Sequence, residues 1–278
     1  MKVAVITMVY NEKINLPIWM SYYGNMFGSE NLYIIDHGSN DGSVENIGEA
    51  SRIKLPRGVY ENESRAQMIS RFHSALLPYY DVVIYTDCDE MIVPDPNYFK
   101  NLKEFLEKEN FEYLTMVGLN IVHNSSIEAD IDWSASVFSQ RKFCQFVSPM
   151  CKTLISKVPV TWSPGFHGSS FFPKIDERLY LFHLKRADLK TNLDRLELTR
   201  KINWKSDKLG LHQRSSDEEM IKLFESYTRY SVTDDFSFSQ EVAEFISETK
   251  LDSKGIYSCK DIRGKKMVMI PERFIGVF

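Results

Sequence analysis

The residues with the clearest chemical potential are three carboxylates that follow an apolar, β-branched run at residues 82–85. They are Asp87, Asp89 and Glu90, with Cys88 between the first two. If the strand pattern continues, its alternation puts Asp87 and Asp89 on one side and Cys88 on the other. Two hard oxygen ligands at the end of a buried strand suit Mg²⁺ or Mn²⁺ with room for phosphate oxygens.

A structural alternative exists for the same stretch. Acidic triplets occur by chance, and this one precedes a charged amphipathic pattern over residues 98–109 that Asp95 or Asn97 would cap as a helix. The metal-site hypothesis therefore depends on which other residues of the chain lie near these carboxylates.

The elements that must position these carboxylates alternate in type. Apolar runs predict strands, and amphipathic patterns predict helices between them. The predicted strands cover residues 3–9, 31–36, 53–60, 81–86, 113–122, 152–160 and 178–184, and the first helices cover residues 15–28, 44–50 and 65–77. This alternation indicates an α/β fold with a mostly parallel, Rossmann-like sheet flanked by helices. Ligands in such folds bind at the carboxyl ends of the strands.

After about residue 185 helical patterns take over, at residues 187–203, 217–228 and 239–249. We therefore expect a catalytic domain of residues 1–185 and a helical extension of residues 186–278. Residues 185–208 are rich in lysine and arginine. Such a face would suit a membrane surface, an anionic lipid-linked acceptor or a diphosphate, and the alternative is a solvated helix face.

Composition narrows the class of protein. The chain has 278 residues, of which 43% are hydrophobic and 26% charged, as in soluble globular proteins. Its net charge of -4 gives no support to a general nucleic-acid partner. The four cysteines show no zinc spacing, which favours free thiols in a reducing compartment. Without a signal-peptide pattern or a membrane-spanning run, we expect a cytoplasmic protein, with peripheral membrane contact as an open alternative.

Polar residues follow the other predicted strands as well. Asn11 and Glu12 come after the first strand, where free backbone groups can bond a planar base, and Asp36 ends the second. An ordinary loop is the alternative for the first pair. Arg65 begins a helix in acidic surroundings, where it would bind a phosphate or pair with a nearby glutamate.

Four segments in this order resemble a known family: TMVYNE, IDHGSNDGS, ENESRAQMIS and TDCDEMIVP. They resemble the GT-A-fold glycosyltransferases, and above all glycosyltransferase family 2 and the group with a DxDEF-like metal motif. The resemblance covers residues 1–100 well and residues 150–190 loosely. It implies a nucleotide-sugar donor lying across the first half of the sheet, with Mn²⁺ or Mg²⁺ (manganese or magnesium) as the cofactor.

The resemblance also implies roles for individual residues. Asp89 would bind the metal directly, Asp87 the ribose, the metal or both, and Glu90 would orient nearby groups. The family's asparagine two positions after Arg65 is Gln67 here, which departs from the pattern. The implied nucleotide-sugar-binding residues are Val9, Asn11, Glu12, Asp36, Arg65 and Asp87.

Family members often add a histidine ligand from the second half of the chain. His167, in the glycine-flanked segment PGFHG, matches that position better than His183 at the end of an apolar strand, although each is also explained as a core histidine. Trp162 would stack on the sugar or belong to the core. For the catalytic base we favour Asp132 among the loop carboxylates that also include Glu128, Asp130 and Asp176, and inverting and retaining chemistry both stay open.

The sequence thus predicts a metal-dependent glycosyltransferase. It would move a sugar, with a UDP-sugar as the favoured donor, to a hydroxyl of a glycan or lipid-linked acceptor in polysaccharide biosynthesis. One alternative is a sugar nucleotidyltransferase, although residues 7–13 lack the glycine-rich loop expected there. A second alternative is a non-catalytic scaffold in a polysaccharide-assembly complex.

Overall fold

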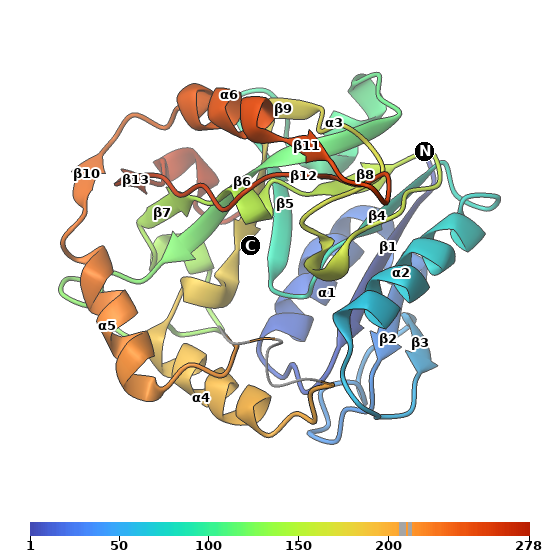
Figure 1. Ribbon diagram of the computed structural model, residues 1–278, viewed down its shortest axis with the longest axis horizontal. Coiled ribbons are helices and arrows are strands. Elements are labelled where there is room, and N and C mark those ends of the chain that lie inside the picture. Colours follow the sequence, from blue (N-terminus) through green and yellow to red (C-terminus); the bar gives the residue numbers. More distant parts are fainter. Residues whose placement is uncertain (206–209, 211–212) are drawn as a thin grey trace.

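The first half of the chain forms a parallel sheet. The computed structural model describes residues 1–205, 210 and 213–278. Apolar, largely β-branched segments form β1 (Val3–Val9), β2 (Leu32–Asp36), β3 (Ser51–Lys54) and β4 (Val82–Tyr85), which lie in the order β4-β1-β2-β3 (Figure 1). All three pairings are parallel. Parallel neighbours need crossover connections, and α1 (Asn15–Phe27) and α2 (Asn62–Leu76) supply two of them.

The second half continues the same sheet with antiparallel neighbours. β8 (Thr153–Ser156) pairs with β4 and with β6 (Tyr113–Val122), and β7 (Phe143–Phe146) lies on the far side of β6. β9 (Ile175–His183) pairs with β6 in parallel and with β5 (Glu90–Pro94) in the antiparallel sense. α3 (Leu102–Lys108) contacts β5. The β5–β9 pairing brings the end of β9 beside the carboxylate segment.

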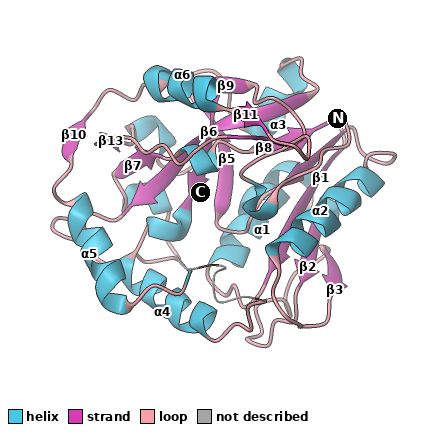
Figure 2. Ribbon diagram, viewed as in Figure 1, coloured by secondary structure: helices cyan, strands magenta, loops and turns pink. Residues whose placement is uncertain are grey.

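The last third of the chain surrounds this sheet and then rejoins it. α4 (Leu189–Arg200), α5 (Asp217–Tyr227) and α6 (Ser239–Glu248) lie around the margin of the strands (Figure 2). β13 (Lys266–Met269) pairs with β7 and with β10 (Ser231–Thr233), while β11 (Lys250–Leu251) and β12 (Tyr257–Ser258) form a separate hairpin. Short 3-10 turns cover Ser29–Asn31, Val137–Ser139, Ser148–Met150, Pro164–Phe166, Leu184–Arg186 and Glu272–Phe274.

The expected α/β architecture, a large sheet flanked by helices, is confirmed, with a second half of mixed parallel and antiparallel pairings added to the parallel first half. The described part of the expected helical extension contains three α-helices, but it also returns β10 and β13 to the main sheet. The division at residue 185 therefore stays a prediction. Among the described residues, no helix combines the length and apolar character needed to cross a bilayer.

Several local predictions differ from the structure. Residues 44–50 form turns instead of a helix, and the third strand ends at residue 54 instead of continuing to residue 60. Asn101 caps α3 by accepting from the Glu104 amide at 3.0 Å. The alternative for the carboxylate stretch named Asp95 or Asn97 as the cap, but the Asp95 carboxylate binds the Arg273 guanidinium at 2.7 and 2.8 Å.

Candidate active site

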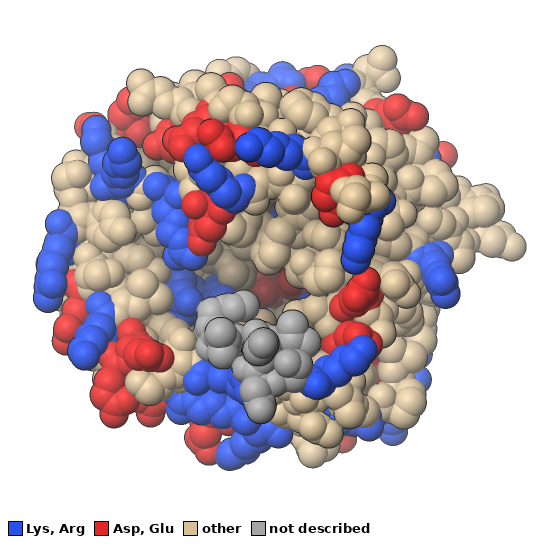
Figure 3. Space-filling model, in the orientation of Figure 1, with Lys and Arg blue, Asp and Glu red and all other residues tan. Residues whose placement is uncertain are grey.

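A cavity of about 270 Å³ lies beyond the carboxyl ends of β1, β2 and β4 and is bordered by residues of α4. In Figure 3, lysine and arginine side chains gather around a hollow in this face, with acidic side chains inside it. The structure brings together many of the residues that the sequence singled out. Those that line the cavity are Val9, Glu12, Arg65, Asp87, Asp89, Glu90, His167 and His183.

The carboxylates are positioned by a turn, not by strand alternation. After β4 the chain turns at residues 87–89 and enters β5, and the Glu90 amide donates to the Asp87 carbonyl at 3.0 Å. The Leu184 amide donates to the Asp89 carbonyl at 2.8 Å, which ties this turn to the end of β9. All four residues from Asp87 to Glu90 border the cavity, so Cys88 does not lie on the opposite side as strand alternation predicted.

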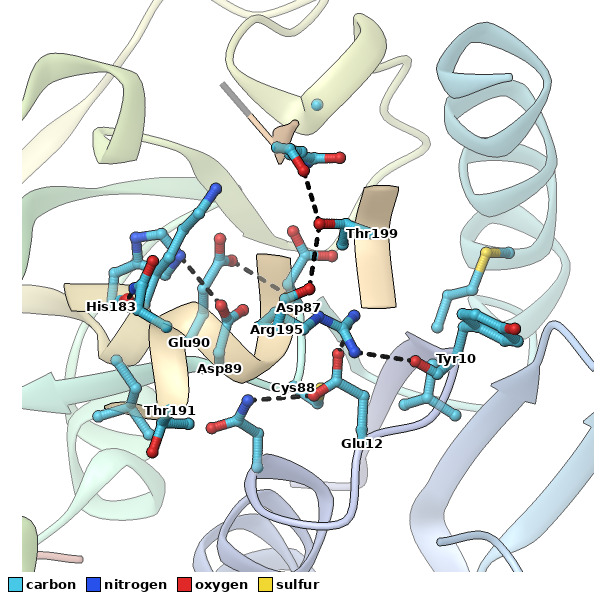
Figure 4. Close-up of a pocket in the computed structure, with 18 of the residues that line it drawn as sticks. Tyr10, Glu12, Asp87, Cys88, Asp89, Glu90, His183, Thr191, Arg195 and Thr199 are labelled. Atoms are coloured by element: carbon cyan, nitrogen blue, oxygen red, sulfur yellow. Dashed lines mark hydrogen bonds and ion pairs between the residues drawn. The ribbon is translucent and has the colours of Figure 1, made fainter. Parts of the chain in front are cut away.

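Asp89 and His183 face each other across the cavity floor (Figure 4), with 3.2 Å between Oδ2 and Nε2. The other ring nitrogen, Nδ1, lies 2.8 Å from Asn120 Oδ1. Burial lowers the pKa of His183, with Asp89 acting in the opposite direction, so the ring is neutral at pH 7. The hydrogen bond between Nε2 and the carboxylate lowers the pKa of Asp89. When a cation binds there and Nδ1 donates to Asn120, the lone pair of Nε2 is free to serve as a second ligand.

The charge state of Asp89 suits such a cation. Burial alone would raise the pKa of Asp89, but His183, Lys185 and Lys152 together lower it, so the carboxylate is ionised at neutral pH. Asp89, Glu90 and His183 offer ligand atoms that all lie within 4.8 Å of one another. Carboxylate oxygens with one imidazole nitrogen fit a divalent cation, and we assign no particular metal from this donor set.

The other carboxylates of the cavity already have positive partners. Arg65 and the Tyr85 hydroxyl bind the Asp87 carboxylate. Lys152 Nζ lies 2.5 Å from a Glu90 oxygen, and both side chains are buried. Burial raises the pKa of Glu90, and this ion pair opposes that rise. Among the implied ligands, Asp89 thus has the carboxylate most open to an added cation.

His167 lies on the same cavity but does not touch Asp89 in this structure. Its Nδ1 lies 2.7 Å from the Pro149 carbonyl, which can only accept, so Nε2 carries the lone pair. The protein packed around the ring lowers its pKa to about 4, and Lys152 acts in the same direction. His183 adjoins the carboxylate, whereas His167 lines another part of the cavity, so which of the two would bind a metal stays a prediction.

Positive charge enters the cavity from α4 and the turn before it. Arg195 spans the opening to the β1–α1 loop, with 2.5 Å to a Glu12 oxygen and hydrogen bonds of 3.1 and 2.9 Å to the carbonyls of Tyr10 and Asn11 (Figure 4). Lys185 has no carboxylate partner among the described residues, and burial lowers its pKa to about 8. The basic stretch thus turns Lys185, Arg186 and Arg195 toward the cavity, while Lys208 lies outside the described residues.

Four predicted residues do not line the cavity. Asp36 is fully buried, bound by the Arg52 guanidinium and the Ser39 amide, so it has no free edge for a base. Trp162 is 3% exposed and donates to the Thr153 carbonyl, which makes it a core residue without a stacking face.

The other two are held in surface turns. Asn11 adopts a φ of 55° and its side chain bonds Asn40. Asp132 is exposed and accepts from Ser134, which lowers its pKa and makes it a weaker base. Neither side chain is among those that border the charged cavity.

Sequence reasoning missed Tyr10, Arg57 and Lys152 as cavity residues. Lys152 carried a usable signal, because a lone lysine among apolar residues near a strand needs a buried acid. Arg57 carried none, since it follows a short edge strand in a segment of mixed composition.

No known protein family matches the chain, and no curated protein matches it. Among solved structures, a mycobacterial protein has 16% identity over 46% of this chain and 44% of its own, with a TM-score of 0.29. The CTP complex of CMP:2-keto-3-deoxy-manno-octonic acid synthetase has 8% identity over 80% of this chain and 86% of its own, also with a TM-score of 0.29. The chain thus spans less than half of the first protein, and likenesses this weak carry no argument about function.

Proposed function

We propose that this chain is a metal-dependent glycosyltransferase that uses a nucleotide-sugar, with a UDP-sugar as the favoured donor. One observation carries the proposal. The ionised carboxylate of Asp89 faces a neutral imidazole, and the unpaired ammonium of Lys185 lines the same cavity. Such a site offers a place for a divalent cation and a positive group for the oxygens of a diphosphate.

The residues of this chain would divide the work as follows. Asp89 and His183 would hold the cation, and His167 lies on the same cavity. When bound, Mn²⁺ or Mg²⁺ would neutralise the charge that develops on the leaving diphosphate. Lys185 would meet phosphate oxygens directly, and its partial burial strengthens that attraction because less water screens it than at the surface.

Arg65 and Lys152 act through their neighbours. They hold Asp87 and Glu90 in place, so that the turn keeps its shape when ligands bind. The acceptor would be a hydroxyl of a glycan or lipid-linked molecule, in polysaccharide biosynthesis, with contact at a membrane surface as part of the proposal.

The test is nucleotide binding with and without metal. Thermal melts of the wild type would be recorded with UDP, GDP, CDP or dTDP, in Mn²⁺ and in EDTA, alongside Asp89→Asn. Asp132→Asn is the matched control, because it removes an exposed carboxylate outside the cavity. We expect a metal-dependent rise in melting temperature for the wild type and the control, and none for Asp89→Asn. At a hundredfold excess over Kd the rise corresponds to about 2.7 kcal/mol.

Two results would contradict the proposal. One is an absence of stabilisation by any nucleotide in folded wild type, and the other is an equal stabilisation in EDTA and in Asp89→Asn. Release of free sugar or its transfer from a UDP-sugar in Mn²⁺ then separates an enzyme from a nucleotide-binding scaffold. Release of diphosphate from UTP and a sugar phosphate would instead indicate a nucleotidyltransferase.

A further inference from the structure

Arg57 lines the same cavity as Asp89, and its guanidinium forms no ion pair with a carboxylate among the described residues. It follows β3, and its Cζ lies 3.6 Å from the centroid of the Tyr10 ring. Its Nη1 lies 3.3 Å from His37 Nδ1, and in the described part of the chain no carboxylate pairs with it. Nη2 is buried and has no acceptor there. A charged donor that lacks a hydrogen-bond acceptor in a cavity indicates that a ligand supplies the acceptor.

The position of Arg57 identifies which part of a nucleotide it would meet. Asp89 follows β4 and Arg57 follows β3, and the order β4-β1-β2-β3 separates these strands by three steps. At strand spacing this is about 14 Å between the two backbones. A backbone separation of this size suits a nucleotide whose phosphates lie beside Asp89 and whose base lies toward Arg57.

This end of the cavity supplies donors and rings but few free acceptors. Asp36 is held by Arg52, and Asp41 accepts from the Ser43 amide and hydroxyl. The carbonyls of Tyr10 and Asn11 accept from Arg195. A guanidinium can only donate, and the rings of Tyr10 and Tyr60 offer faces on which a base can stack.

We propose that Arg57 determines base specificity by donating to a ring carbonyl oxygen, and that it selects uracil over cytosine. The inference rests on the proposed function. Uracil presents a carbonyl where cytosine presents an amino group, and an amino donor facing a guanidinium would leave both without an acceptor. Guanine also has an acceptor edge, but a cavity of about 270 Å³ lies at the small end for ligand sites and favours a pyrimidine.

The experiment measures Kd by calorimetry in Mn²⁺ for three probes: UDP, CDP and inorganic diphosphate. Arg57→Met keeps the unbranched stem of the side chain and removes its donors. Lys54→Met, at the end of the strand that precedes Arg57, removes an exposed positive charge outside the cavity and is the matched control. A lost charged hydrogen bond predicts that Arg57→Met binds UDP at least about 10-fold more weakly. We expect CDP and diphosphate to change by less than about 3-fold, and Lys54→Met to resemble the wild type.

Each other outcome has a distinct meaning. If Arg57→Met weakens UDP, CDP and diphosphate equally, Arg57 binds phosphate, so the inference is overturned while the proposed function stands. If the wild type binds UDP and CDP equally, the inference is likewise overturned. If the folded wild type binds no nucleotide in Mn²⁺, both proposals fall. Arg57→Lys tests geometry, because it keeps the charge but loses the planar donors, and we expect it to lose discrimination between UDP and CDP.

Discussion

At the scale of single residues, the carboxylates of the cavity differ in what neutralises them. Glu12, Asp87 and Glu90 each meet an arginine or lysine, whereas Asp89 meets an imidazole that burial keeps neutral. In a poorly solvated site an anion without a fixed counter-charge is costly. Among the described residues, Asp89 is thus the cavity carboxylate without an arginine or lysine at ion-pair distance, which leaves it open to a removable cation.

A second histidine gives a prediction about pH. His73 is fully buried on α2, edge-on to Trp162, and burial lowers its pKa from 6.5 to about 4. A histidine whose pKa is lower in the folded state contributes its full stability above pH 6.5. That contribution falls as the pH drops toward 4, because the unfolded chain takes up the proton first. From this residue we expect a loss of about 3 kcal/mol across that range.

His73→Phe isolates the effect of this titration. Urea unfolding of both proteins between pH 8 and 4 would show a smaller fall in stability for the variant, since all other titrating groups are shared. Parallel pH profiles for the two proteins would contradict the prediction.

Single residues also show where sequence reasoning stopped. The order of motifs located Asp89 and Arg65 in the cavity, because strand ends in an α/β sheet converge on one edge. It misjudged Asp36 and Trp162, whose types fit a ligand contact but whose neighbours Arg52 and Thr153 take up their polar atoms. Pairing of this kind depends on segments far apart in the chain, which spacing within a motif does not report.

At the scale of elements, the start of α4 is held by one buried carboxylate. Asp188 accepts from the Thr191 amide at 2.9 Å as the N-cap of the helix. It also accepts from Arg141 Nη2 at 3.1 Å, and both side chains are almost wholly buried. Asp188 therefore caps the first turn of α4 and neutralises a buried arginine. Together these contacts fix the direction in which α4 presents Arg195.

Removing the Asp188 carboxylate should strongly destabilise the fold. We expect Asp188→Ala to lower the free energy of unfolding by about 3–5 kcal/mol, because it leaves Arg141 buried without a counter-charge. The lost cap accounts for about 1 kcal/mol of that. Asp188→Asn keeps an acceptor for the cap, so it should recover part of the loss in urea denaturation. A cost below 1 kcal/mol for the alanine variant would refute this account.

The helices and strands themselves were largely predictable from the pattern of apolar and polar residues. Strands β1, β2, β4 and β6 are apolar runs bounded by polar turns, and α1 ends at Gly28, whose φ of 89° suits glycine. The helix predicted for residues 44–50 is wrong: these residues form turns, and Gly48 adopts a φ of 58°, which a helix does not allow. The antiparallel pairings of the second half could not be predicted, because the sequence of a strand does not determine the direction of its neighbour.

At the scale of the whole molecule, the C-terminal segment belongs to the main core. Phe274 is fully buried against Phe182 and Tyr180 of β9, and β13 pairs with β7 of the main sheet. We therefore expect the chain to unfold in one cooperative transition, in spite of the division at residue 185 that the sequence suggested. Two separated transitions by fluorescence and circular dichroism would restore that division.

Two variants of this segment sharpen the prediction. Phe274→Ala should cost about 3–5 kcal/mol of unfolding free energy, as expected for a large side chain removed from a packed core. Met269→Ala, at a position 41% exposed on the same segment, should cost much less. Similar small losses for both would mean that residues 266–278 only lie against the molecule.

The bridge from Arg195 to Tyr10, Asn11 and Glu12 also bears on how the protein is made. The two ends of this bridge are separated by most of the chain, so at ribosomal rates of about 5–20 residues per second Arg195 emerges roughly 10–40 s after Glu12. Until then Glu12 has no arginine partner, and the β1–α1 loop lacks the contact that ties it to α4. This side of the cavity is therefore completed only late in synthesis.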